Sequence, residues 1–139
     1  MNHRLPARPD RVFSGVLAVV VICASLTACS SDPEAAKQKS FARAEQYFAD
    51  QKYDEAIIEY RNALQEDPKF AAARFKLAES YIAKNDYQNA YAEYIRAADL
   101  SPDDIRIQAR AGNMLLLGRR FEEARTRARA ILQKDPSNL

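Results

Sequence analysis

The sequence of 139 residues has few of the residues on which many enzymes and disulfide-stabilised domains depend. It contains one histidine, two cysteines, three glycines and no tryptophan. Glycine is scarce and apolar residues make up 47% of the chain, with alanine abundant, so the composition favours helices over a β-sandwich. The formal net charge of +2 excludes the strong positive field of a nucleic-acid-binding protein, and we expect no nucleic-acid partner.

The two cysteines and the histidine all lie near the N-terminus. Cys23 and Cys29 are six positions apart, whereas a disulfide framework needs cysteines throughout the folded part, so we expect no disulfide. Beyond Cys29 the chain has no histidine, no thiol and no glycine-rich phosphate loop. Its acidic pairs, such as Asp54 and Glu55, stand at predicted helix starts, where carboxylates offset the helix dipole. The sequence therefore predicts a protein that is not an enzyme and has no metal, cofactor or small-molecule substrate.

Residues 1–28 have the order of a secretory signal peptide, with a basic start, an apolar run and small residues at the end. The apolar run is marginal as a permanent anchor, because a membrane-spanning helix needs about 20 apolar residues. It ends in Leu26-Thr27-Ala28-Cys29, which resembles the lipobox of bacterial lipoproteins. The resemblance implies that Cys29 is lipidated and becomes the first residue, followed by a polar tether over residues 29–36. The alternative is an uncleaved signal anchor with an incidental cysteine.

The residue after Cys29 bears on the location within the bacterial cell envelope. Ser30 stands there rather than aspartate, and in enteric-type sorting this resembles the default signal for the outer membrane. The resemblance implies a protein held on the membrane by a lipid anchor on Cys29 and facing the periplasm. Such an anchor is almost irreversible with several acyl chains, since each buried CH₂ contributes about 0.8 kcal/mol.

After the tether the sequence repeats itself with a fixed period of about 34 residues, which is typical of a stacked repeat architecture. Prolines, alanines and aromatic residues all share the spacing. The positions are Pro68, Pro102 and Pro136; Ala56, Ala90 and Ala124; Tyr53, Tyr87 and Phe121; Tyr60 and Tyr94; Ala63 and Ala97.

Each repeat has the pattern of two amphipathic helices, because apolar residues recur at three- and four-residue steps. Tight turns are expected at residues 50–52, 84–86 and 118–120, with Asn85 and Gly118 able to adopt the left-handed conformation that ends many helices. The proline of each repeat ends the second helix, since the residue before proline disfavours helical geometry.

These features resemble the tetratricopeptide repeat, with repeats at residues 37–70, 71–104 and 105–139. The consensus tryptophan is absent, and Ser40, Arg74 and Gln108 stand in its place. The third repeat departs further from the pattern. The resemblance implies an all-α fold, a right-handed α-solenoid of about three helix-turn-helix repeats preceded by a signal-peptide helix.

The resemblance also implies that the first helix of each repeat lines an inner groove. An apolar stripe there would suit a partner helix or an extended peptide. The alternative is that these side chains pack within their own repeats. The candidate groove residues are Phe41, Glu45, Phe48, Phe75, Glu79, Ile82, Arg106, Arg110 and Asn113.

Two of these residues carry a more specific hypothesis. Arg106 and Arg110 stand where chaperone-binding tetratricopeptide domains place basic residues that clamp the terminal carboxylate of a peptide. Glu45 and Lys76, however, occupy positions where that clamp needs asparagines. Solvated surface arginines are therefore the competing interpretation.

Charge is unevenly distributed along the repeats. Residues 32–104 hold 10 basic and 15 acidic residues, whereas residues 105–139 hold 8 and 3. The basic third repeat could meet an acidic partner or lipid head groups, or form a solvated face that complements an acidic further repeat. Nothing in the sequence caps this repeat, which indicates a piece of a longer protein or one completed by another subunit.

The sequence thus favours a membrane-anchored periplasmic scaffold that binds a protein or peptide partner. Its opening repeats resemble, less specifically, those of long tetratricopeptide lipoproteins associated with exopolysaccharide and exosortase-type surface systems. A role in envelope assembly, secretion or exopolysaccharide export follows as an expectation. The alternative is a purely structural repeat segment of a longer protein whose binding surface lies elsewhere.

Overall fold

The computed structural model describes residues 32–137, which fold into helices without any strand in that range. The predicted signal peptide and the lipidation site Cys29 lie outside the described residues. No helix within residues 32–137 is long and apolar enough to cross a membrane. The helices are α2 (Pro33–Ala49), α3 (Tyr53–Glu66), α4 (Ala71–Ala83), α5 (Tyr87–Leu100), α6 (Ile105–Leu117) and α7 (Phe121–Lys134).

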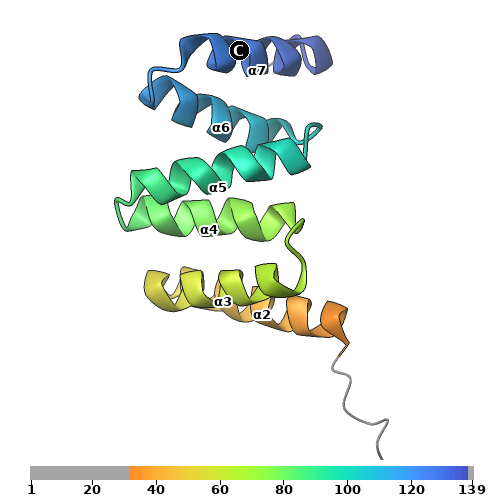
Figure 1. The fold of residues 1–139 in the computed structure, drawn as a ribbon, viewed down its shortest axis with the longest axis vertical. Helices are drawn as coiled ribbons and strands as arrows, with labels where there is room; N and C mark the ends of the chain where they lie inside the picture. Colours follow the sequence, from red (N-terminus) through yellow and green to blue (C-terminus); the bar gives the residue numbers. More distant parts are fainter. Residues whose placement is uncertain (1–31, 138–139) are drawn as a thin grey trace, which may run out of the picture. The chain divides into compact units, whose positions relative to one another are not determined.

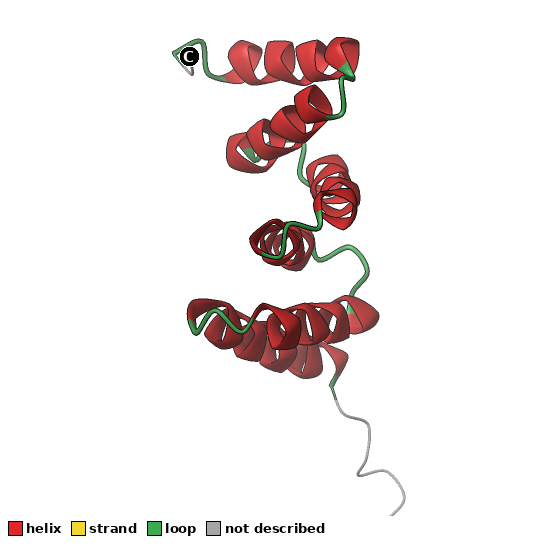
Figure 2. Cartoon of the chain, turned by 90° about the vertical axis from the view of Figure 1, so that its left-hand side faces the viewer, coloured by secondary structure: helices red, strands yellow, loops and turns green. Residues whose placement is uncertain are grey.

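The six helices form a stack in chain order, and Figure 1 shows it with α2 and α3 at one end and α7 at the other. Helices pack as the antiparallel pairs α2–α3, α4–α5 and α6–α7, and α4 and α6 then pack on the preceding pair. Figure 2 shows the same succession from the side. The predicted all-α repeat fold is confirmed.

The first helix begins earlier than the sequence predicts. Residues 33–36, which we assigned to the polar tether, form the first turn of α2. Two local features explain this start: the Asp32 carboxylate accepts a hydrogen bond from the Glu34 N–H at 3.0 Å, and Pro33 occupies the first helical position. Asp86 and Asp104 also cap their helices, α5 and α6, by accepting hydrogen bonds of 3.1 Å from the N–H groups of Asn89 and Ile107.

All three turns within the helix pairs have the hydrogen bonds of a Schellman motif. In the first, the Lys52 N–H bonds to the Tyr47 carbonyl at 2.9 Å and the Gln51 N–H to the Phe48 carbonyl at 3.0 Å. The residue after the helix cap has positive φ in each turn, at Gln51 (60°), Asn85 (61°) and Arg119 (58°).

The prediction for Asn85 was right, and that for Gly118 was wrong. Gly118 has φ −78° and serves as the C-cap of α6. The hydrogen-bond pattern requires the left-handed conformation one residue later, so it falls on Arg119, in register with Asn85.

Alanines and a few aromatic residues make up the core. Small side chains let neighbouring helices approach closely, and Tyr60, at 0% exposure, and Phe75, at 2%, fill the larger gaps. The alanines with no exposed surface are Ala44, Ala56, Ala63, Ala73, Ala78, Ala90, Ala97 and Ala111.

Polar contacts replace the missing consensus tryptophan. The Arg74 guanidinium pairs with the Glu93 carboxylate at 2.7 Å, linking α4 to α5. One repeat later the donor is on the second helix instead of the first, and the Arg127 guanidinium of α7 donates to the Gln108 side-chain oxygen of α6 at 2.8 Å. Both contacts join the two helices of one repeat, so hydrogen bonds hold positions that a large apolar ring would otherwise fill.

Candidate functional site

The first helices of the repeats bring five of the nine predicted groove residues to one pocket. Its volume is about 460 Å³, and we call it the central groove. Most of its lining comes from α4 and α6, with one residue from α2 and one from α5. The predicted residues that line it are Phe48, Glu79, Ile82, Arg110 and Asn113, and they are joined by Lys76, Ala83, Tyr94 and Met114.

Apolar side chains form one wall of the central groove. Phe48, Ile82 and Met114 are all partly buried and pack against the core. Phe48 is fixed in place by Tyr53, whose ring meets it edge-on with 5.5 Å between centroids. The wall therefore offers a preformed surface for an apolar side chain.

Charged side chains also line the central groove, next to the apolar wall. The Lys76 ammonium pairs with the Glu79 carboxylate at 2.9 Å and lies 5.2 Å from the centre of the Phe48 ring. Arg110 of α6 also lines the groove, is exposed, and makes no ion pair with any residue in the range 32–137. One positive charge of the groove is thus neutralised within the protein, and the charge of Arg110 is available to a ligand.

Tyr94 contributes a hydroxyl group to the groove. The residue is only 2% exposed, and its ring meets Phe75 edge-on at 5.5 Å. Burial raises the pKa of Tyr94 to about 12, the Glu79 charge adds to the rise, and Arg110 opposes it. No residue of the described chain hydrogen-bonds to the Tyr94 hydroxyl, which lies where it could pair with a ligand carbonyl or amide.

The other four predicted residues lie beside the central groove. Phe41 packs against Tyr60 and Phe70, with centroid distances of 5.7 and 4.8 Å. Glu45 accepts a hydrogen bond from the Tyr60 hydroxyl, and burial together with this bond raises the pKa of Tyr60. These two predicted residues, Phe41 and Glu45, therefore support the first helix pair.

Phe75 and Arg106 form a separate contact. The Arg106 guanidinium carbon lies 4.8 Å from the centre of the Phe75 ring, within cation–π range. Arg106 therefore covers a buried ring, whereas Arg110, one turn later on α6, lines the groove. The predicted apolar stripe is split, because Phe41 and Phe75 pack inward while Phe48 and Ile82 face the pocket.

The sequence did not predict two residues that line the groove. Tyr94 is on α5, the second helix of its repeat, and serves in the sequence only as a landmark of the repeat. Met114 is on α6, a first helix, and reaches the groove from the position after the predicted Asn113. Among residues 32–137, no group of acidic residues has the arrangement of a metal site.

A family model of the tetratricopeptide repeat matches residues 47–109. A search of curated proteins found no match. Several solved structures share the fold. The second repeat domain of human RPAP3, in complex with the HSP70 peptide SGPTIEEVD, is 22% identical with a TM-score of 0.67 and covers 77% of this chain and 89% of that one.

Two further structures are similar to the same extent. The Arabidopsis OM64 domain has a TM-score of 0.65 at 17% identity, with 77% of this chain and 88% of that one covered. The first repeat domain of Spaghetti (RPAP3), bound to the HSP90 peptide SRMEEVD, has a TM-score of 0.66 at 22% identity and covers 81% of this chain and 88% of that one. At these identities the likeness establishes the fold.

Proposed function

We propose that the chain is a tetratricopeptide-repeat scaffold that binds an extended segment of a partner protein in the central groove. The family model that matches residues 47–109 and the fold shared with solved repeat domains support this proposal. The segment has an acidic group, which pairs with Arg110, and a neighbouring apolar side chain, which packs against Phe48, Ile82 and Met114. The unpaired Arg110 beside this apolar wall is the observation on which the proposal chiefly rests.

The chemistry of the groove suits such a segment. A guanidinium binds a carboxylate through charge-assisted hydrogen bonds, which are about twice as strong as neutral ones. The Tyr94 hydroxyl and the Asn113 amide line the same pocket and can satisfy the backbone of an extended peptide. The peptides bound in two of the similar structures, SRMEEVD and SGPTIEEVD, combine acidic residues with apolar ones, which supports this ligand class.

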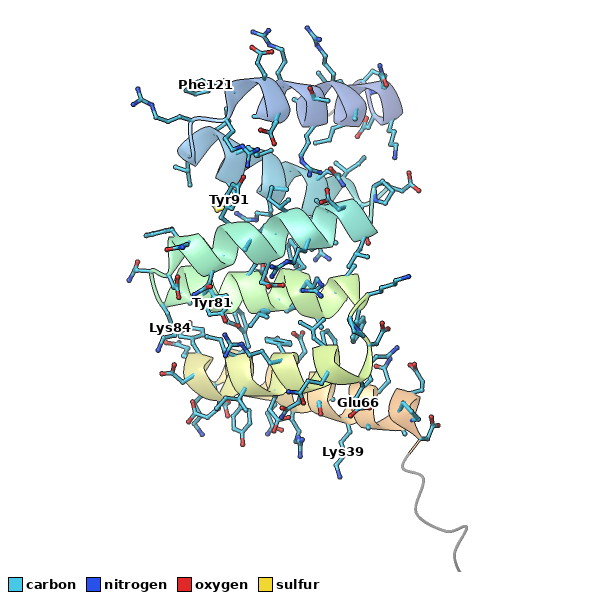
Figure 3. The ribbon with its side chains drawn as sticks, in the orientation of Figure 1. Lys39, Glu66, Tyr81, Lys84, Tyr91 and Phe121 are labelled. Atoms are coloured by element: carbon cyan, nitrogen blue, oxygen red, sulfur yellow. The ribbon has the colours of Figure 1, made fainter. Side chains whose placement is uncertain are left out.

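Binding of the labelled peptide SRMEEVD to the purified full chain, measured by fluorescence anisotropy, tests the proposal. Arg110→Glu reverses the charge that receives the carboxylate, so binding should weaken at least about tenfold. Lys39→Glu is the matched control, because Lys39 is also exposed, has no ion-pair partner in the described range and points away from the stack beyond α2 (Figure 3). Equal weakening by both variants, or no binding to the unaltered chain at millimolar peptide, would contradict the acidic-segment proposal.

We further propose that this scaffold acts at the bacterial envelope, held on the outer membrane by lipid on Cys29 and facing the periplasm. The lipobox-like sequence before Cys29 supports the anchor, and the resemblance to surface-system lipoproteins supports a role in envelope assembly, secretion or exopolysaccharide export. In a bacterial host, Cys29→Ser should abolish incorporation of labelled fatty acid and leave a precursor of higher mass. A mature protein that starts at another residue would refute the anchor.

The second candidate is a purely structural role, in which these repeats only continue a longer scaffold. Partial inward packing of the predicted stripe, at Phe41 and Phe75, favours it. The two candidates differ in one measurable respect. A structural segment would tolerate Arg110→Glu without loss of any partner, since Arg110 contributes no ion pair within residues 32–137.

A further inference from the structure

The outer face of the α6–α7 pair is apolar and is covered by no other helix of the described chain. It holds a pocket of about 450 Å³ between the two helices. Leu116, Phe121 and Leu132 line this pocket and are 51%, 58% and 37% exposed. Figure 3 shows Phe121 at the start of α7, at the end of the stack. We call this surface the end face.

The first two helix pairs of the chain show which kind of helix covers a face of this type. The corresponding face of α2–α3 is covered by α4, and that of α4–α5 by α6. Each covering helix buries a stripe at every fourth residue, Ala73, Leu77 and Tyr81 in α4 and Ile107, Ala111 and Leu115 in α6. All six residues are at most 6% exposed. The ligand of such a face is therefore an amphipathic helix with apolar residues at i, i+4 and i+8.

A second copy of this chain does not fit the end face. The first helix of a copy, α2, has Lys39, Arg43 and Tyr47 at the corresponding stripe, and both basic residues are exposed. Lys39 has no ion-pair partner within residues 32–137, and Arg43 pairs with Glu59 of α3 at 2.8 Å. Docking a copy would bury these charged groups where α4 and α6 have apolar residues, which disfavours head-to-tail association of copies.

An arginine of α7 without an ion-pair partner in the described range indicates the charge that a docked helix would carry. In the first repeat, Arg61 donates a hydrogen bond of 2.6 Å to the Tyr81 hydroxyl of the covering helix α4. Arg129 has the same place in the third repeat as Arg61 in the first, is exposed, and has no ion-pair partner within residues 32–137. A carboxylate at the third stripe position of a docked helix would pair with Arg129.

We propose that the end face binds an amphipathic helix of a partner protein, with apolar residues at i and i+4 and an acidic residue at or beside i+8. This site is distinct from the central groove, because the two pockets share only Asn113 among their lining residues and lie on different faces of α6. The two sites can therefore fail independently in experiments.

The test uses helical peptides taken from the sequence of α4. Two peptides with the sequence of residues 70–84 are made with capped ends, one with Tyr81→Glu and the other with Tyr81→Lys. Calorimetric titration into the full chain should show the Glu peptide binding about three- to fivefold more tightly, as expected for a partly exposed ion pair. Arg129→Ala should remove this difference, and Leu132→Asp or Phe121→Asp should abolish binding of both peptides.

Each contrary outcome has a distinct meaning. Equal binding of the two peptides would refute the acidic partner helix, and binding that survives both Leu132→Asp and Phe121→Asp would refute the end face as the site. Failure of both peptides to bind would overturn the proposal, as would sedimentation of the chain as a dimer that Leu132→Asp dissociates. Arg110→Glu should leave binding of these peptides unchanged, which separates this result from the central groove.

Discussion

At the scale of single residues, two buried tyrosines have the same repeat position and different contacts. Tyr60 and Tyr94 are one repeat apart, and both rings lie in the core. The Tyr60 hydroxyl donates to the Glu45 carboxylate, whereas the Tyr94 hydroxyl has no partner in the described chain and lines the central groove. The first hydroxyl therefore contributes to stability, and the second is available for binding.

Removing each hydroxyl group tests this division of roles. Tyr60→Phe should lower the free energy of unfolding by about 1–2 kcal/mol, because it removes a hydrogen bond to a charged group. Tyr94→Phe should change it by less than about 0.5 kcal/mol and instead weaken peptide binding in the groove. Urea unfolding followed by circular dichroism measures both. The assignment fails if the two variants lose the same stability.

The burial of Tyr94 predicts that the folded chain loses stability at high pH. Burial raises the pKa of Tyr94 from its usual 10.0 to about 12, so above pH 10 the unfolded chain releases the proton while the folded chain keeps it. The unfolded state then binds fewer protons, and the free energy of unfolding falls as pH rises from 10 to 12. Unfolding by urea at pH 9 to 11.5 should show a shallower fall for Tyr94→Phe than for the unaltered chain. Parallel curves would contradict the burial of this phenol.

At the scale of helices and turns, the stability of each helix pair depends on a residue in the left-handed conformation. Gln51, Asn85 and Arg119 occupy it, and none is glycine. A residue other than glycine is strained there, and asparagine is strained least. The three turns therefore have the same backbone geometry, but the left-handed conformation costs less free energy at Asn85 than at Gln51 or Arg119.

Glycine substitutions in these turns should reveal the difference. Arg119→Gly should raise the free energy of unfolding by about 0.5–1 kcal/mol, since Arg119 has φ 58° and its side chain makes no ion pair within the described range. Asn85→Gly is the control with the same backbone and should give a smaller gain. Thermal unfolding compares them, and a loss of stability in Arg119→Gly would show that its side chain stabilises the fold.

The fixed repeat period was enough to predict the helix pairs and the all-α repeat fold, because the spacing of alanines, aromatics and prolines determines which faces pack. The position of the left-handed residue was missed at Gly118, since glycine favours that conformation but the hydrogen bonds of the turn place it at Arg119. The start of α2 was missed because residues 33–36 are mostly polar and were therefore assigned to the tether, although Asp32 caps a helix that begins at Pro33.

The sequence predicted only some of the residues that line the central groove. Residues such as Ile82 and Asn113 could be placed from the resemblance, since they project from the first helices. Tyr94 projects from a second helix, and the division between buried Phe75 and groove-lining Phe48 depends on packing between repeats. Periodicity within one repeat does not contain that information.

At the scale of the whole folded part, charge and burial both change along the stack. The first two repeats are acidic in balance, and their apolar faces are covered by the following helices. The third is basic and leaves Leu116, Phe121 and Leu132 exposed. The stack therefore has one proposed partner surface at its middle, the central groove, and a second at its end.

Site-specific photo-crosslinking tests the central claim, that the central groove binds a partner protein, most directly. A photoreactive amino acid is placed at Ala83, which lines the central groove but not the pocket of the end face, or, as the control, at Lys39 on the far side of α2, in the full chain in its native cells. We predict a crosslinked partner at Ala83 that Arg110→Glu removes and that Lys39 does not capture. The same products at both positions, or a partner at Ala83 that persists in Arg110→Glu, would contradict the account.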